Sequence, residues 1–229
     1  MTRIKQYKAI IFDMDGTIID SNGVWHSATH NFVTSKKNDV THAELADIQK
    51  QARGLALVAT CLIIKNTFNL QESVETLIEE KTGHALALYK DALKFIPGFK
   101  EFFKEVEKHD LKVAIATNAE DITLALTITS LQLDNFFGEH IYNITHVNNV
   151  YKPYPDIYLY AAQRLGIAPE ECIAIEDSTH GVNAAVAAGI FCIGINTGND
   201  AHALRHAHMI VDNYNEIDLE ELLYKKETK

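Results

Sequence analysis

The chain has 229 residues, of which 47% are hydrophobic and 23% are charged, and its formal net charge at pH 7 is -10. This composition is typical of a soluble globular protein. The acidic balance argues against general binding to nucleic acids or to anionic membranes, because both require a basic surface. Any site for a phosphate group must therefore be made attractive locally, by a cation, a lysine or backbone N–H groups.

The cysteines and the apolar runs indicate the compartment. Cys61, Cys172 and Cys192 do not form a close-spaced metal motif, and we expect reduced, buried thiols. The first apolar run ends at Asp13, which makes it too short for a secretory signal. The longest apolar stretch, 56–64, is too short to span a bilayer. We therefore expect a cytoplasmic protein.

The first predicted element is a strand over Ala9–Phe12, because a wholly apolar run is typical of a strand buried on both faces. It runs directly into Asp13-Met-Asp-Gly-Thr17, which contains two carboxylates, a glycine and a hydroxyl. Asp13 is then expected at the carboxyl end of the strand, where open α/β sheets bind their ligands. A polar turn is the simpler alternative, and this stretch alone leaves it open.

A helical block follows the first strand, and strands then alternate with helices. The helices predicted in the block are Trp25–Ser35, Thr41–Arg53, Leu55–Phe68, Gln71–Lys81 and His84–Leu93. The later predicted strands are Lys112–Thr117, Ile141–Ile144, Cys172–Glu176, Phe191–Ile195 and Met209–Val211. Further helices are predicted after Pro97-Gly98 and over 121–131, 156–165, 178–188 and 216–224. Alternating strands and helices predict right-handed crossovers and a parallel sheet.

The predicted fold class is therefore α/β, with a Rossmann-like, doubly wound parallel sheet as its core. The helical block interrupts this core after its first strand, so it is most simply an inserted α-helical domain. We assign residues 1–20 and 95–229 to the core domain and residues 21–94 to the helical domain.

Polar residues follow several of the predicted strands at equivalent places. They are Asp13 and Asp15, Thr117 and Asn118, and Glu176 and Asp177, with Lys152 in a loop on the same side of the sheet. Singly, each has an ordinary structural explanation: a helix cap, a turn or a solvated lysine. Together they are poorly explained by chance, and all should gather at the carboxyl edge of one sheet.

These residues resemble a known family. Asp13-Met-Asp-Gly-Thr17, the strand that ends in Thr117, Lys152-Pro-Tyr-Pro-Asp156 and Glu176-Asp177-Ser178 resemble, in the same order, the four signature motifs of the haloacid dehalogenase superfamily. The segment Gly181–Gly189 resembles its phosphatase and β-phosphoglucomutase-like branch. The helical block resembles the small helical cap, of the C1 type, that this superfamily inserts between its first and second motifs.

The resemblance implies catalytic roles. Asp13 is implied as the nucleophile that forms an aspartyl-phosphate, and Asp15 as the acid that protonates the leaving oxygen and then activates water. Lys152 is implied to hold the phosphate next to Asp13. Thr117 and Asn118 are implied as binding groups for the phosphoryl oxygens.

The resemblance also implies a Mg²⁺ cofactor, which neutralises the repulsion between a carboxylate and a phosphate. Its implied ligands are Asp13, Asp177 and the backbone carbonyl of Asp15, with Glu176 as a possible further partner. The family's dehalogenase and phosphonate-cleaving branches lack an aspartate where this chain has Asp15, so carbon–halogen and carbon–phosphorus cleavage are not expected.

The cap should choose the substrate. Arg53, between two cap helices, and His26, near the first linker, are candidate substrate contacts, although a solvated arginine at a helix end explains Arg53 equally well. Related phosphomutases and phosphatases often carry His where this chain has Trp25, and this departure weakens a sugar-phosphomutase assignment.

The expected function is that of a Mg²⁺-dependent phosphatase acting on a small soluble phosphomonoester, such as a sugar phosphate, through an aspartyl-phosphate. A phosphomutase of the β-phosphoglucomutase type is the first alternative, since it uses the same core residues and returns the phosphoryl group to the sugar. A catalytically silent binding or regulatory protein on the same fold is the second. In each case the expected partner is a small phosphorylated molecule, not nucleic acid or membrane, and the expected assembly is a monomer or weak dimer.

Overall fold

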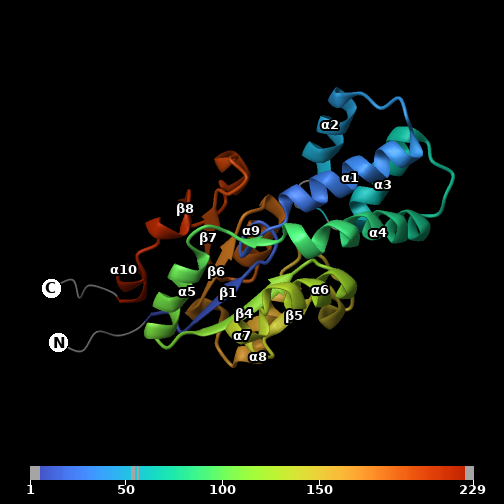
Figure 1. Ribbon diagram of the computed structural model, residues 1–229. Coiled ribbons are helices and arrows are strands. Elements are labelled where there is room, and N and C mark those ends of the chain that lie inside the picture. The colour runs from blue at the N-terminus through green and yellow to red at the C-terminus, as the bar shows by residue number, and fades with distance from the viewer. Residues whose placement is uncertain (1–5, 53–54, 56, 225–229) are drawn as a thin grey trace. The chain divides into compact units, whose positions relative to one another are not determined.

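The computed structural model describes residues 6–52, 55 and 57–224, and its contacts divide the chain into two units (Figure 1). The first unit contains the chain up to Ile19, Phe95–Asn118 and the chain from Asp134 onward. The second unit contains Asp20–Lys94 and Ala119–Leu133.

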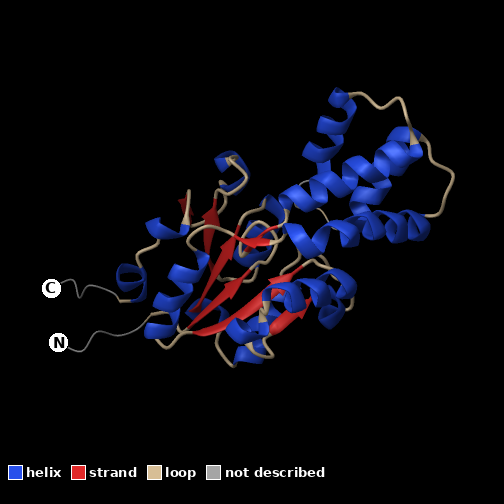
Figure 2. Cartoon of the chain, in the orientation of Figure 1, coloured by secondary structure: helices blue, strands red, loops and turns tan. Residues whose placement is uncertain are grey.

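A six-stranded sheet forms the centre of the first unit, and its paired strands are parallel (Figure 2). Its strands are β1 (Ala9–Phe12), β4 (Lys112–Thr117), β5 (Ile141–Asn143), β6 (Cys172–Glu176), β7 (Phe191–Ile195) and β8 (Met209–Val211). Their order, β5-β4-β1-β6-β7-β8, is 3-2-1-4-5-6 when these strands are counted along the chain. This is the order of a doubly wound Rossmann sheet, so the predicted fold class is confirmed.

The strand boundaries follow the apolar runs of the sequence closely. One predicted strand, Ile141–Ile144, is a residue shorter than expected because Ile144 begins a 3-10 helix, η1 (Ile144–Val147). The side chain of Asn143 caps that helix. A local cap of this kind competes with continuation of the strand.

One face of the sheet is covered by aromatic side chains from α5 (Phe99–Lys108) and α7 (Asp134–Phe137). The ring of Phe12 in β1 lies with its centroid 5.6–6.4 Å from those of Phe99, Phe102, Phe103 and Phe137. The spacing of the phenylalanines in α5 places them on one side of the helix, as the sequence predicts. Aromatic burial of this extent fixes the orientation of β1 in the sheet.

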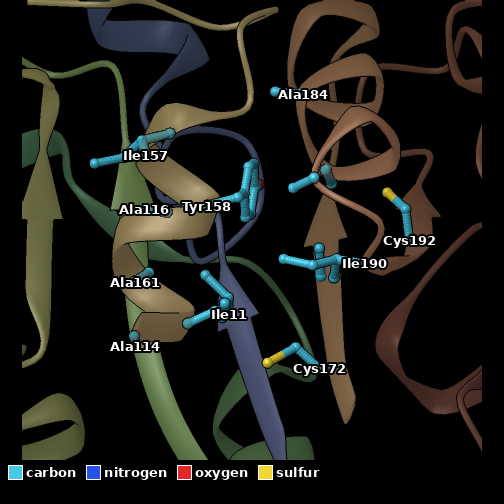
Figure 3. Packing of buried hydrophobic residues seen from close by; sticks show 14 of the residues in the cluster. Ile11, Ala114, Ala116, Ile157, Tyr158, Ala161, Cys172, Ala184, Ile190 and Cys192 are labelled. Atoms are coloured by element: carbon cyan, nitrogen blue, oxygen red, sulfur yellow. The ribbon is translucent and has the colours of Figure 1, made fainter. Parts of the chain in front are cut away.

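The opposite face is covered by α8 (Asp156–Leu165) and α9 (Thr179–Ala187), as Figure 3 shows. Many of the buried residues at this face are alanines, including Ala114 and Ala116 of β4 and Ala161 of α8. Small side chains allow a helix backbone to lie close to a sheet. Ile11 points to this face, and because side chains alternate along a strand, Asp13 follows it on the same side.

Shorter elements complete the first unit. They are η2 (Pro169–Glu171), η3 (Ala201–Leu204), η4 (Tyr214–Glu216) and α10 (Leu219–Leu223). Two further short strands, β2 (Ile19–Asp20) and β3 (Lys94–Phe95), pair with each other where the chain passes from one unit to the other.

The second unit is built from helices. They are α1 (Asn22–Lys36), α2 (His42–Ala52), α3 (Leu57–Phe68), α4 (Val74–Ala92) and α6 (Asp121–Leu131). Residues 119–133 lie in the sequence interval that we assigned to the core, and they group here because α6 packs against α4. Leu126 of α6 packs against a buried cluster that includes Ala28 and Ala85.

The prediction of two helices over 71–93 is wrong, since a single helix, α4, covers most of this interval. Gly83 lies between the two predicted helices, and glycine inside a helix costs about 1 kcal/mol relative to alanine. However, Leu77 before it and Ala85 after it are both fully buried in the helical unit. A continuous helix buries both, and this burial outweighs the cost of the glycine. Ser73 is the N-cap of this helix, and its side chain accepts a hydrogen bond from the Thr76 N–H.

In the described part of the chain, no helix combines the length and the apolar character that are needed to cross a membrane.

Lys81 of α4 is a buried cation in the second unit. Its side chain is almost fully buried, and its Nζ lies 4.5 Å from the centroid of the Trp25 ring. Burial lowers the pKa of Lys81 to about 8, while nearby Cys61 acts in the opposite direction. Among the described residues, no carboxylate forms an ion pair with this ammonium group. The ring face of Trp25 therefore replaces only part of its hydration.

We expect Lys81→Met to raise the free energy of unfolding at pH 7 by about 1–3 kcal/mol, because it removes a poorly compensated buried charge. The folded-state pKa of about 8 lies below the ordinary value of 10.5, so the unfolded state binds more protons between these values. The contribution of Lys81 to stability therefore rises with pH over this window. Urea unfolding at pH 7 and at higher pH measures both effects.

Lys50→Met, on the exposed surface of α2, is the matched control, and its stability should change by no more than about 0.5 kcal/mol. If Lys81→Met were no more stable than the wild type at pH 7, the buried ammonium would not be a source of instability.

Candidate active site

The pairing of the central strands places three residues in one row at the carboxyl edge of the sheet. Phe12 of β1 pairs with Ile115 of β4 and with Ile175 of β6. The next row therefore brings Asp13 beside Ala116 and Glu176, and the Asp13 N–H donates to the Ile175 carbonyl at 3.0 Å. The strand order reverses between β1 and β6. Doubly wound sheets bind ligands at this topological switch point.

Lys152 joins this row. Its Nζ donates to Asp13 Oδ1 at 2.6 Å, to Glu176 Oε1 at 2.6 Å and to the Ala116 carbonyl at 2.8 Å. The side chain of Lys152 is buried, so solvent screens these ion pairs weakly. Its backbone N–H donates to Asn118 Oδ1 at 3.1 Å, which fixes the loop that carries the lysine. The sequence prediction that these residues meet at one edge therefore describes the arrangement seen.

Glu176 is a fully buried carboxylate of the site, and both of its oxygens accept hydrogen bonds. Its Oε1 accepts hydrogen bonds from Lys152 and from the Tyr158 hydroxyl, the latter at 2.8 Å. Its Oε2 accepts from the backbone N–H groups of Asp177 and Ser178 and from the Ser178 hydroxyl. A buried carboxylate satisfied in this way holds its neighbours in place.

Two glycines allow the carboxylates to pack closely. A Cβ atom at Gly181 of α9 would lie 1.7 Å from Glu176 Oε1, and one at Gly16 would lie 2.1 Å from Asp177 Oδ2. Gly16 also has a φ of +83°, a conformation that other residues rarely adopt. The two glycines are therefore required by the positions of Glu176 and Asp177.

The carboxylates of the site are buried close to one another, and this arrangement favours the binding of a cation. Burial and then the Glu176 carboxylate raise the pKa of Asp13 to about 7, although Lys152 acts in the opposite direction. Burial, followed by the charges of Asp13 and Glu176, raises the pKa of Asp177 well above its usual range. For Lys152, burial alone would lower the pKa, but Asp13 and Glu176 outweigh it and raise the pKa. Added positive charge would relieve the carboxylates.

The donor set fits a hard divalent cation. Asp13, Glu176 and Asp177 each offer a carboxylate oxygen, and these oxygens lie within 4.8 Å of one another. When all three carboxylates are ionised beside one ammonium, two negative charges are left over, which matches the charge of Mg²⁺, and oxygen is the ligand that Mg²⁺ prefers. Because both Glu176 oxygens already accept hydrogen bonds, Asp13 and Asp177 are the better available donors.

The turn after β1 is held from the side of β7 and η4. Thr197 donates from its hydroxyl to the Gly16 carbonyl at 2.7 Å, and Tyr214 donates to the Thr17 carbonyl at 2.9 Å. Asp15 lies in this turn, half-buried, and its backbone bridges to Ile19. Hydrogen bonds from two side chains outside the turn therefore hold the segment that carries Asp15.

The remaining predicted site residues lie in different places. Thr117 is buried at the end of β4, one residue after Ala116, and Asn118 follows it. His26 is exposed on α1 of the second unit. Arg53 lies outside the described residues.

Sequence analysis did not predict the roles of Tyr158, Ser178, Thr197 and Tyr214. Tyr158 does carry a signal, because the buried side of α8 is otherwise formed by Ile157, Ala161, Ala162 and Leu165. A tyrosine on an aliphatic face must find a partner for its hydroxyl. The sequence shows that a partner is needed but does not show which residue provides it.

Comparisons with known proteins agree with this architecture. Residues 10–195 match the sequence model of the family described as haloacid dehalogenase-like hydrolase. A phosphorylated carbohydrates phosphatase of Thermotoga maritima is 28% identical over 87% of this chain and 91% of its own. A fructose-1-phosphate phosphatase of Escherichia coli is 27% identical over 83% of this chain and 97% of its own. The crystal structure of a β-phosphoglucomutase from Clostridium difficile superimposes with a TM-score of 0.78 at 22% identity, covering 94% of this chain and 95% of the other.

Proposed function

This chain belongs to the haloacid dehalogenase-like hydrolases, and we propose that it is a Mg²⁺-dependent phosphatase of small phosphomonoesters, such as sugar phosphates. The observation that carries the proposal is the buried cluster at the switch point of the sheet. There Asp13 lies beside Asp177 and Glu176, and Lys152 contacts both Asp13 and Glu176. A nucleophile, a fixed cation and a donor set for a divalent metal are what phosphoryl transfer to a carboxylate needs.

In the first step the Asp13 carboxylate attacks the phosphorus atom. A bond forms between a carboxylate oxygen and phosphorus, and the bond from phosphorus to the ester oxygen breaks. Asp15 gives a proton to the departing ester oxygen, so that the alcohol leaves neutral. The product on the protein is an aspartyl-phosphate at Asp13.

Lys152 neutralises charge during this step. Its Nζ already contacts Asp13 at 2.6 Å, and its hydrogen bonds to Asp13, Glu176 and the Ala116 carbonyl fix its position before the substrate arrives. When bound by Asp13, Asp177 and the Asp15 carbonyl, with Glu176 as a further partner, Mg²⁺ supplies the positive charge that lets an anionic carboxylate approach an anionic phosphate. Thr117 and the backbone N–H of Asn118 bind the remaining phosphoryl oxygens.

In the second step a water molecule attacks the aspartyl-phosphate. Asp15, now ionised, takes a proton from the water as the new bond to phosphorus forms. The bond between the Asp13 oxygen and phosphorus breaks, which releases phosphate and restores the carboxylate. One residue thus serves as acid in the first step and as base in the second.

The helical second unit is proposed as a cap domain, and residues 21–94 are the segment of the sequence assigned to it. Arg53 and His26 are proposed there as contacts to the part of the substrate that does not react. The residues that contact the leaving group in a cap decide which ester is used.

Sugar phosphates are the favoured substrate class because two relatives that match most of this chain, and most of their own length, are named for phosphorylated carbohydrates or fructose-1-phosphate. A phosphomutase remains the alternative, because the same core residues transfer a phosphoryl group to a sugar. The likeness to the β-phosphoglucomutase is at 22% identity, so it supports the fold rather than that activity. Phosphate release to water is therefore the preferred proposal.

The testing experiment is a panel of sugar phosphates, other phosphate esters and nucleotides incubated with the full chain and Mg²⁺. Free phosphate and isomerised sugar phosphate are measured in the same samples. Release of phosphate from at least one ester supports the phosphatase. Isomerisation with little release supports the phosphomutase, and turnover no faster than that of Asp13→Asn supports a silent protein.

A further inference from the structure

Lys152 is shared equally between two carboxylates. Its Nζ lies 2.6 Å from Asp13 Oδ1 and 2.6 Å from Glu176 Oε1, and only the contact with Asp13 places its charge at the reacting group. Any other donor to Glu176 Oε1 therefore affects how the lysine is divided between Glu176 and Asp13.

Tyr158 is such a group. Its hydroxyl donates to Glu176 Oε1 at 2.8 Å, the same oxygen that Lys152 contacts. The Tyr158 oxygen lies 3.5 Å from Lys152 Nζ, and the ring centroid lies 4.9 Å from it. Tyr158 is fully buried between α8 and the sheet, as Figure 3 shows, and burial raises the pKa of its hydroxyl well above the usual range. The hydroxyl is therefore a buried donor to the oxygen of Glu176 that Lys152 also contacts.

Packing alone does not require this hydroxyl. Tyr158 belongs to the buried cluster of Figure 3, whose other members include Ile11, Ala116 and Ile157, and a phenylalanine ring would suit these apolar surroundings equally well. Glu176 already accepts hydrogen bonds at its other oxygen from Asp177 and Ser178. The distinct effect of the hydroxyl is thus on Oε1, where it competes with the lysine.

We propose that Tyr158 is a positioning residue whose hydroxyl, by occupying Glu176 Oε1, keeps Lys152 directed toward Asp13. The inference rests on the proposed phosphatase function, in which Lys152 neutralises charge at Asp13. Without the hydroxyl, Glu176 Oε1 attracts the lysine more strongly, and Asp13 loses part of its counter-charge in the transition state. Tyr158 acts through its neighbours and does not touch the substrate.

The test is Tyr158→Phe in the full chain, with Tyr160→Phe as the control. Tyr160 lies on the same helix, half-buried against Tyr142 and His146 and away from Lys152. We expect kcat for the best phosphate ester to fall by about 10- to 100-fold in Tyr158→Phe, the range found for outer partners of metal-site residues, with KM changed less than about twofold. Tyr160→Phe should match the wild type.

Crystal structures of the same variants give a readout that does not depend on activity. In Tyr158→Phe the distance from Lys152 Nζ to Asp13 Oδ1 should exceed about 3.2 Å, while the contact with Glu176 remains. A wild-type kcat with an unchanged position of Lys152 would overturn the proposal. A fall in kcat no larger than the fraction of Tyr158→Phe that is unfolded would overturn it as well. If the wild type releases no phosphate from any ester, the proposed function fails, and the position of the lysine alone decides the role of Tyr158.

Discussion

Asp13→Asn is expected to lower phosphate release by about 10⁴-fold or more, the scale seen when a covalent nucleophile is removed from an enzyme. The amide is nearly the same size as the carboxylate but cannot form the acyl-phosphate. Burial and Glu176 raise the pKa of Asp13 to about 7, so its surroundings do not favour the charged carboxylate. The fold should therefore persist when a neutral amide replaces it. Steady-state release of phosphate and circular dichroism measure the two expectations.

The control for this substitution is Asp39→Asn, an exposed aspartate outside the site. It should retain wild-type turnover, since surface carboxylates contribute little. Turnover by Asp13→Asn within tenfold of the wild type would assign the nucleophile to another residue, even if the cluster bound a metal.

Removal of divalent metal is expected to reduce turnover to background. Asp13 and Asp177 have raised pKa values because they are buried near other carboxylates, and without a cation the approach of a phosphate dianion adds further repulsion. Dialysis against EDTA followed by assay with added Mg²⁺ should restore the full rate. Ca²⁺ should restore little, because its bonds to oxygen are longer and its coordination number is higher.

The control for metal removal is the thermal unfolding midpoint, measured in EDTA and in Mg²⁺. A folded but inactive chain in EDTA attributes the loss of turnover to the site rather than to unfolding. Turnover that persists in EDTA would remove the metal from the proposed mechanism and leave Lys152 as the cation there.

The sheet was predictable from sequence because its strands are buried on both faces. A run such as Cys172–Glu176 has no polar residue before its end, so its limits coincide with the strand β6. The meeting of Asp13, Lys152 and Glu176 was also predictable, since parallel strands end at a common edge. The register that places Ala116 in the same row required coordinates, because neighbouring apolar residues do not distinguish one register from the next.

Three features were not predictable in the same way. The continuity of α4 through Gly83 depends on the burial of residues on both sides of it, a tertiary effect that outweighs local propensity. The grouping of α6 with the helical unit depends on its contact with α4, which no local pattern encodes. The hydroxyl of Tyr158 belongs to the same class, since its partner is 18 residues away.

The central claim is that Asp13 carries the phosphoryl group during turnover. The most direct measurement is rapid acid quenching during turnover of the best ester, followed by peptide mass spectrometry to locate the phosphoryl group. We predict a phosphoryl group on Asp13 that forms and decays within one turnover. A phosphoryl group on another residue, or turnover that labels no residue at any time, would contradict the account.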